Sequence, residues 1–157
     1  MTFKAVVVIA IVVAAVFGLF YYQATREVEA IRRLGIEIAD ASITRLGLFS
    51  CDIAIKLNYT NPLDYDTPTF RVSNYSIYVN GELVGTSSAP PTKVAARSTV
   101  YQDLTVTIEY AKVSKALVDA LREGKIVVEV RGEVRAKVLF GLLEVSAPFT
   151  STYSIRE

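Results

Sequence analysis

The sequence contains no histidine and only one cysteine, and these absences exclude much of the chemistry that a small domain can carry. Histidine is the commonest general base and the commonest metal ligand, so the usual hydrolase and metalloenzyme arrangements cannot be built. One thiol is too few for a zinc-thiolate cluster or an intrachain disulfide. Glycine-rich phosphate-binding loops are missing as well. We therefore expect a protein that is not an enzyme, with no catalytic residue, no metal site and no cofactor.

Neither sign of charge predominates. Lys and Arg together number 17, and Asp and Glu number 16. From Ile36 onward 13 basic and 14 acidic residues are interspersed. A nucleic-acid-binding face needs clustered Lys and Arg, so we expect no nucleic-acid partner. The 157 residues leave room for one domain of ordinary size once an N-terminal segment is set aside.

Apolar residues are abundant, and they concentrate at the N-terminus. Residues 5–25 carry no charge, and residues 5–20 are continuously apolar. About 20 such residues, rising about 1.5 Å each, cover a hydrocarbon core of about 30 Å. Tyr21 and Tyr22 follow, where an aromatic pair suits the membrane interface. We predict a single transmembrane helix that contacts the lipid bilayer through residues 5–22.

A cleaved secretory signal peptide is the alternative for this segment. Against it, the apolar run is longer than a usual signal-peptide core, and Tyr22 is too bulky for the first position of a cleavage site at residues 22–24. Lys4 on one side competes with three arginines between residues 26 and 33 on the other, so charge alone leaves the orientation open. Because a very short N-terminal flank usually stays cytoplasmic, we expect a cell-membrane protein whose β domain is extracytoplasmic.

A helical stalk should continue from the apolar run. The residues before Gly35 are strong helix formers, with Val28, Ile31 and Leu34 at three-residue spacing. Gly35 stands where a helix C-cap would. We predict that residues 1–35 form one anchor and stalk helix that ends at Leu34. Its apolar stripe would pack on the domain or on another copy, which leaves a homo-oligomer through the stalk as an alternative.

Beyond Gly35 the apolar period becomes alternating, which is typical of half-buried strands. From Cys51 to Tyr59, for example, every second residue is expected to point into the core. Asn80-Gly81 is the strongest hairpin signal, because both residues tolerate the positive φ of a type I′ turn. We predict strands near residues 36–46, 48–60, 69–80, 82–88, 98–110, 125–136 and 138–154.

One interruption of the strands is helical. Residues 111–122 carry an apolar face, and Gly124 can end a helix there. The predicted face consists of Val113, Ala116, Leu117, Ala120 and Leu121. About seven strands without a parallel strand-helix-strand rhythm predict an all-β fold. We expect an antiparallel β-sandwich over residues 36–157 with one short crossover helix, preceded by the transmembrane helix.

The order of the turn and loop motifs resembles a known family. The motif residues are Asn61 and Pro62 at a strand end, Asn80 and Gly81 in the hairpin, Gly85 beyond it, a proline-bearing loop before residues 94–100, and Gly132 after the helix. Together they resemble the WHy domain (water stress and hypersensitive response), the second family of late-embryogenesis-abundant proteins, over residues 36–155. The resemblance implies a fibronectin type III-like β-sandwich without catalytic residues. It also implies a link to protection against desiccation and other stress, often behind a membrane anchor.

Few residues are candidates for sites of their own. Asp64 and Asp66 could offer oxygens to calcium, but two carboxylates are too few, so we expect a solvated turn. Asn58 and Asn74 begin sequons and are candidate N-glycosylation acceptors, although both lie in predicted strands. Cys51 lies in a strand-like run, which predicts a buried thiol; a reactive thiol or an intermolecular bridge is the alternative.

The tyrosines are spread over different predicted strands. We expect them to pack in the sandwich with their hydroxyls at the rim, and a tyrosine-lined binding face is the alternative. The residues concerned are Tyr65, Tyr75, Tyr78, Tyr101, Tyr110 and Tyr153.

The anchor, the missing catalytic groups and the family resemblance together predict a membrane-anchored, non-enzymatic stress-protective or binding module. It would act through the sandwich surface on membrane, envelope or unfolded protein clients. A pilin-like structural subunit of a surface filament is the alternative, because such subunits also join an apolar N-terminal helix to a β domain. The apolar run lacks an early acidic residue, which argues against the filament.

Overall fold

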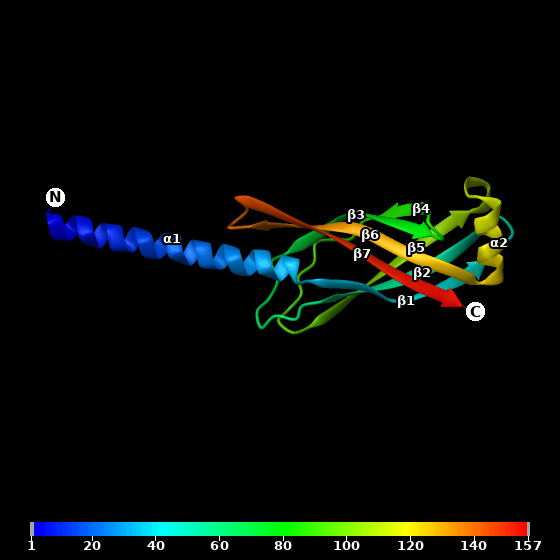
Figure 1. Ribbon diagram of the computed structural model, residues 1–157, viewed down its shortest axis with the longest axis horizontal. Coiled ribbons are helices and arrows are strands. Elements are labelled where there is room, and N and C mark those ends of the chain that lie inside the picture. Colours follow the sequence, from blue (N-terminus) through cyan, green and yellow to red (C-terminus); the bar gives the residue numbers. More distant parts are fainter. Residues whose placement is uncertain (1, 157) are drawn as a thin grey trace.

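The computed structural model describes residues 2–156, without the side chains of residues 73 and 74. A long N-terminal helix projects from a β domain (Figure 1). The elements are α1 (Phe3–Arg32), β1 (Gly35–Leu46), β2 (Ser50–Thr60), β3 (Phe70–Val79), β4 (Glu82–Ser87), β5 (Thr99–Glu109), the 3-10 helix η1 (Tyr110–Lys112), α2 (Lys115–Glu123), β6 (Lys125–Val138) and β7 (Leu143–Arg156).

The strands form two antiparallel sheets. One has the order β1-β2-β5 and the other the order β4-β3-β6-β7. β2 pairs with β5 without interruption from Ser50 to Thr60, and β6 pairs with β7 from Lys125 to Val138. The predicted fold class, a mostly β sandwich behind a long apolar helix, is therefore confirmed.

The core is formed by the inward residues of both sheets. On β2 alternate residues from Cys51 to Tyr59 are buried, as the sequence pattern predicted. The Tyr59 ring meets Phe70 of β3 edge to face, with ring centroids 5.7 Å apart. The buried hydroxyls of Tyr59 and Tyr75 hydrogen-bond to each other. The two sheets are thus joined by aromatic packing that leaves neither phenol unpaired.

The stalk helix ends earlier than predicted. Arg33 is its C-cap, and the Arg33 N–H donates to the Glu29 carbonyl at 2.9 Å. Gly35 is not a left-handed cap but the first residue of β1, paired with Thr60. That expectation was wrong because the chain passes directly from the helix into a strand and needs no left-handed turn to reverse it.

The crossover helix begins later than predicted, at Lys115. Ser114 is its N-cap, and the Ser114 hydroxyl accepts from the Leu117 N–H at 3.2 Å. Glu82, at the start of β4, accepts from both the Ser114 N–H (2.9 Å) and the Ser114 hydroxyl (2.7 Å). This long-range contact fixes where α2 starts, and no local pattern could have revealed it.

Only part of the predicted apolar face of α2 is buried. Leu117 and Leu121 lie in the core, whereas Ala116 is exposed and Val113 precedes the helix in extended backbone. Gly124 ends the helix in the left-handed conformation, as predicted. α2 covers the end of the sandwich that is remote from α1 (Figure 1).

Two hairpin turns connect strands of the four-stranded sheet. Asn80 (φ 51°) and Gly81 (φ 82°) both have positive φ, which confirms the predicted two-residue turn between β3 and β4. The strand predicted from residue 138 instead begins at Leu143. Residues 139–141 all have positive φ and turn the chain, so they cannot extend a strand.

Candidate functional site

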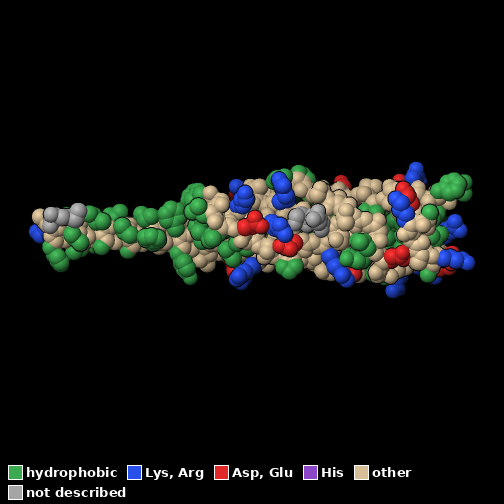
Figure 2. Space-filling view, turned by 90° about the horizontal axis from the view of Figure 1, so that it is seen from above, with side chains coloured by type: hydrophobic (Ala, Val, Ile, Leu, Met, Phe, Trp, Pro, Cys, Tyr) green, Lys and Arg blue, Asp and Glu red, His purple; other side chains and the backbone are tan. Residues whose placement is uncertain are grey.

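Among residues 2–156, one helix is long and apolar enough to cross a membrane, and it is α1. Its most apolar stretch is not buried by any other part of the structure. Apolar side chains run along it to the start of the domain, where Lys and Arg side chains become frequent (Figure 2). The apolar stretch of α1 therefore ends where the domain begins.

Three connections of the sandwich surround the last part of α1. They are the β2–β3 loop (61–69), the β4–β5 loop (88–98) and the β6–β7 hairpin (139–142), all at one end of the domain (Figure 1). Ile31 of α1 is buried in the hydrophobic core, and Leu34 packs against it. We call this region the junction.

Two contacts tie α1 to the hairpin. The Glu27 carboxylate accepts a hydrogen bond from the Leu139 N–H at 3.0 Å. Farther toward the N-terminus, the Phe20 ring meets Phe140 edge to face, with centroids 5.9 Å apart. The hairpin thus lies alongside the helix rather than above its end.

Asn61 holds the two long loops of the junction together. Its side chain is 1% exposed, and its amide nitrogen donates to the carbonyls of Tyr65 (2.8 Å), Val94 (3.3 Å) and Ala95 (3.2 Å). Its amide oxygen accepts from the Leu63 N–H at 3.1 Å, which is the turn cap expected at a strand end. The sequence indicated the cap but not the link to the second loop.

Asp66 of the β2–β3 loop makes further contacts with the β4–β5 loop. The Asp66 carboxylate accepts from the Ala96 N–H at 2.9 Å and lies 3.9 Å from the Lys93 ammonium. Tyr65 lies under the Arg26 guanidinium of α1, which is 4.1 Å from the ring centroid. In the described part of the chain, no three His, Cys, Asp or Glu side chains are grouped as metal ligands. The hydrogen bond from the Ala96 N–H shows that Asp66 positions the second loop.

Two neighbouring hollows lie beside α1 at the junction, and both include Glu27 and Pro68. The smaller holds about 310 Å³ and the larger about 810 Å³. Basic, acidic and aromatic side chains line the larger one: Arg71, Arg135, Lys137, Glu144, Phe70 and Phe140. Such a lining can hold an anionic or amphipathic group, but it provides no nucleophile with an adjacent base.

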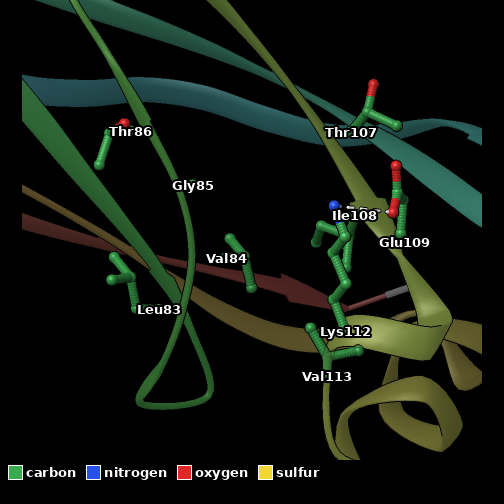
Figure 3. A pocket seen from close by; sticks show the side chains of 9 residues that line it. All are labelled: Leu83, Val84, Gly85, Thr86, Thr107, Ile108, Glu109, Lys112 and Val113. Atoms are coloured by element: carbon green, nitrogen blue, oxygen red, sulfur yellow. Dashed lines mark ion pairs between the residues drawn. The ribbon is translucent and has the colours of Figure 1, made fainter.

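A third hollow of about 370 Å³ lies on the open side of the sandwich, between the edge strands β4 and β5 (Figure 3). Val84 and Ile108 belong to its lining, and the Lys112 ammonium pairs with the Glu109 carboxylate at 3.1 Å. On the opposite side the sheets are joined, because the Ile38 N–H donates to the Ser151 hydroxyl at 2.9 Å. We call the side between β4 and β5 the open seam of the sandwich, and the side between β1 and β7 the closed seam.

The single thiol, that of Cys51, lies buried among core side chains. Cys51 is fully buried, and this burial, followed by the nearby charge of Asp52, raises the pKa of the Cys51 thiol. Burial also raises the pKa of Tyr59. Neither group is poised for chemistry near neutral pH, since both shifts favour the protonated form.

The tyrosines do not share one face. Tyr75 is in the core, Tyr78 lies under the Arg131 guanidinium at 4.5 Å, and Tyr110 lies near that of Arg122 at 5.4 Å. They belong to different surfaces, which supports the packing interpretation rather than a tyrosine-lined binding face.

Comparison with known proteins decides the family. Residues 56–152 match the family model described as "Late embryogenesis abundant protein", and this is more than half of the chain. The chain belongs to the second late embryogenesis abundant (LEA) family. The match runs from β2 into β7 and leaves α1 and β1 outside it. Proteins of the LEA family are not typically enzymes.

Two solved structures share the LEA fold of this chain. The solution structure of a protein from Arabidopsis thaliana superposes with a TM-score of 0.59 at 19% identity, covering 80% of this chain and 82% of that one. A second solution structure, of a protein assigned to the LEA proteins, gives a TM-score of 0.53 at 13% identity, covering 98% and 88%. Identities this low support the fold alone. No curated protein sequence matches the chain.

The motif residues that suggested the LEA family have structural positions. Gly132 lies on β6, where an added Cβ would be 2.7 Å from the Phe149 ring. At Gly85 on β4 an added Cβ would be 3.5 Å from Val106, which is an ordinary contact distance.

The two candidate N-glycosylation acceptors lie in strands. Asn58 is a half-buried residue of β2, and the side chain of Asn74 lies outside the described residues.

Proposed function

We propose that this LEA protein is a single-pass, membrane-anchored and non-enzymatic stress-protective module of the WHy type. The observation that carries the proposal is the combination of a LEA-family sandwich with an unburied apolar helix fastened to one end of it. A cleaved signal peptide has no need to pack on the mature domain. Cleavage near residues 22–24 would leave Glu27 and Ile31 in place, so among these contacts it is the packing of Phe20 on Phe140 that favours retention of α1.

The finer description of the domain rests on strand order. Three strands, β1-β2-β5, face four, β4-β3-β6-β7, which supports the fibronectin type III-like assignment made from the family resemblance. The location that belongs to this proposal is the cell membrane, with the sandwich on the extracytoplasmic side. On that side of the membrane, Asn58 is a candidate N-glycosylation acceptor whose side chain the structure describes.

Protection would be exerted by the sandwich surface on unfolded protein clients. The open seam suits this role, because β4 and β5 are edge strands with unpaired backbone groups on either side of a hollow. A client segment in extended conformation can pair with such an edge. Anchoring would concentrate this activity at the membrane surface.

The direct test uses the full-length protein in phosphatidylcholine nanodiscs mixed with a heat-labile enzyme at a near-equal molar ratio. We expect less light scattering and more surviving enzyme activity after heating or drying than with empty nanodiscs. An unrelated single-pass β-sandwich protein in nanodiscs is the matched control. Scattering equal to that of the control would refute the protective function.

The filament alternative receives no support from the LEA-family match. The apolar stripe of the stalk, in which the homo-oligomer alternative was placed, already packs on the sandwich through Ile31 and Leu34. We therefore propose client proteins and the bilayer as the partners.

A further inference from the structure

The most exposed large apolar side chains of the domain, those at least 80% exposed, lie at two turns. One is the distal β1–β2 turn with Leu48 and Phe49, and the other is the tip of the β6–β7 hairpin. At the hairpin tip Phe140 is 82% exposed and Leu142 is 80% exposed. Phe140 and Leu142 lie close together at the tip, and an exposed apolar patch of neighbouring side chains can mark a contact surface. Only the hairpin tip adjoins α1, so only there does the structure indicate what covers it.

The position of the hairpin along α1 sets its depth. Leu139 is tied to Glu27, whereas Phe140 meets Phe20, seven residues nearer the N-terminus. Seven residues of α-helix correspond to about 10 Å. The hairpin therefore extends alongside α1 toward the N-terminus, to the level of the apolar run (Figure 1).

The backbone of the tip presents these side chains outward. Leu139, Phe140 and Gly141 have φ of 52°, 57° and 86°. Left-handed backbone at two residues other than glycine is uncommon, and here it places Phe140 against Phe20 instead of folding it onto the sheet.

Charges above the tip match a lipid headgroup layer. The larger hollow of the junction, whose lining includes Phe140, carries Arg71, Arg135 and Lys137 together with the acidic Glu27 and Glu144, so basic side chains outnumber acidic ones by one. Basic side chains next to an aromatic tip are the usual arrangement at a membrane interface, with cations at the phosphates and the ring at the acyl boundary.

We infer that the tip of the β6–β7 hairpin, carrying Phe140 and Leu142, inserts into the same bilayer leaflet that α1 enters. This inference rests on the proposed membrane anchor. Insertion gives the sandwich a second attachment point beside α1, so the domain cannot rotate freely about the helix axis. The hollow lined by Arg71, Arg135 and Lys137 then faces the lipid headgroups, and the open seam keeps a fixed angle to the membrane.

The chain has no tryptophan, so a single substitution provides a unique fluorescent probe. Phe140→Trp, Leu142→Trp and the matched control Phe49→Trp, at the equally exposed distal turn, are reconstituted as full-length protein in phosphatidylcholine vesicles. Some vesicles carry bromine on the acyl chains near the headgroup. We expect blue-shifted emission and several-fold stronger bromine quenching for both hairpin probes than for Phe49→Trp, whose emission should be that of an indole in water.

Emission and quenching of both hairpin probes equal to those of Phe49→Trp, in protein that resists alkaline extraction from the vesicles, would overturn the inference and leave the anchor intact. Release of the protein by alkaline extraction would overturn the anchor and the inference together. Protection of the buried Cys51 from thiol reagents, compared among the three variants, verifies that each is folded.

Discussion

Buried side chains of the sandwich and of its junction with α1 carry polar groups whose partners local patterns explain only in part. Tyr59 and Tyr75 are buried and bonded through their hydroxyls, and Asn61 bonds to carbonyls of two loops. The burial of Tyr59 was predictable from strand alternation. Its partner was not, because residue 75 is on the facing sheet and becomes a neighbour only when the sheets pack.

The hydroxyl pair of Tyr59 and Tyr75 predicts non-additive stability losses. Tyr59→Phe or Tyr75→Phe leaves one buried hydroxyl without its partner, which costs about 1–3 kcal/mol in the free energy of unfolding. The double substitution removes both hydroxyls, so its loss should be smaller than the sum by about 1 kcal/mol. Urea unfolding of the full-length variants in detergent micelles measures this, and strictly additive losses would contradict the pairing.

The raised pKa of Tyr59 predicts a loss of stability in alkali. Below about pH 10, the ordinary tyrosine pKa, folded and unfolded chains both keep this proton. Above it the unfolded phenol ionises while the buried one stays protonated, so the unfolded state binds fewer protons and stability falls with rising pH. Melting temperatures from about pH 8 to about pH 11 should fall more steeply for the native chain than for Tyr59→Phe/Tyr75→Phe; equal slopes would show that Tyr59 contributes nothing.

At the scale of elements, alternation and turn residues predicted most of the sandwich. Asn80-Gly81 located a hairpin because its backbone requirement is local. The start of α2 and the long β6–β7 hairpin were misplaced by a few residues, because Glu82 fixes Ser114 from another strand and because Leu139 and Phe140 adopt a backbone that their side chains do not favour.

The packing of β6 against β7 predicts a difference between two motif glycines. Gly132→Ala places a Cβ 2.7 Å from the Phe149 ring and 3.2 Å from Val72, so it should lower the free energy of unfolding by about 1–3 kcal/mol. Gly85→Ala meets only Val106 at 3.5 Å and should change it by less than about 0.5 kcal/mol. Thermal unfolding followed by circular dichroism compares them.

A smaller side chain at position 149 serves as the control for this comparison. Phe149→Leu should relieve much of the loss in Gly132→Ala, because it removes the ring atoms that the new Cβ would meet. Equal melting temperatures for Gly132→Ala and Gly85→Ala would refute the close-packing explanation.

For the whole molecule, the sequence indicated an anchor, a stalk and a domain, with the apolar stripe of the stalk packed either on the domain or on another copy. In the structure the stripe packs on the domain: Ile31 enters the core, and three connections that are distant in sequence surround the stalk. Sequence periodicity describes each segment separately, so it could not show that residues 61–69, 88–98 and 139–142 meet around one helix. The junction and the hairpin contact with Phe20 are the features that only the three-dimensional arrangement supplies.

The retention of α1 in the mature membrane protein tests the account most directly. Membranes from cells producing the full chain are extracted with alkaline carbonate, and the pellet is digested with trypsin and analysed by mass spectrometry. The account predicts that the pellet contains peptides of the sandwich together with the apolar peptide of residues 5–26, which lies between Lys4 and the bond after Arg26. Recovery of the sandwich in the carbonate supernatant without that peptide would contradict it.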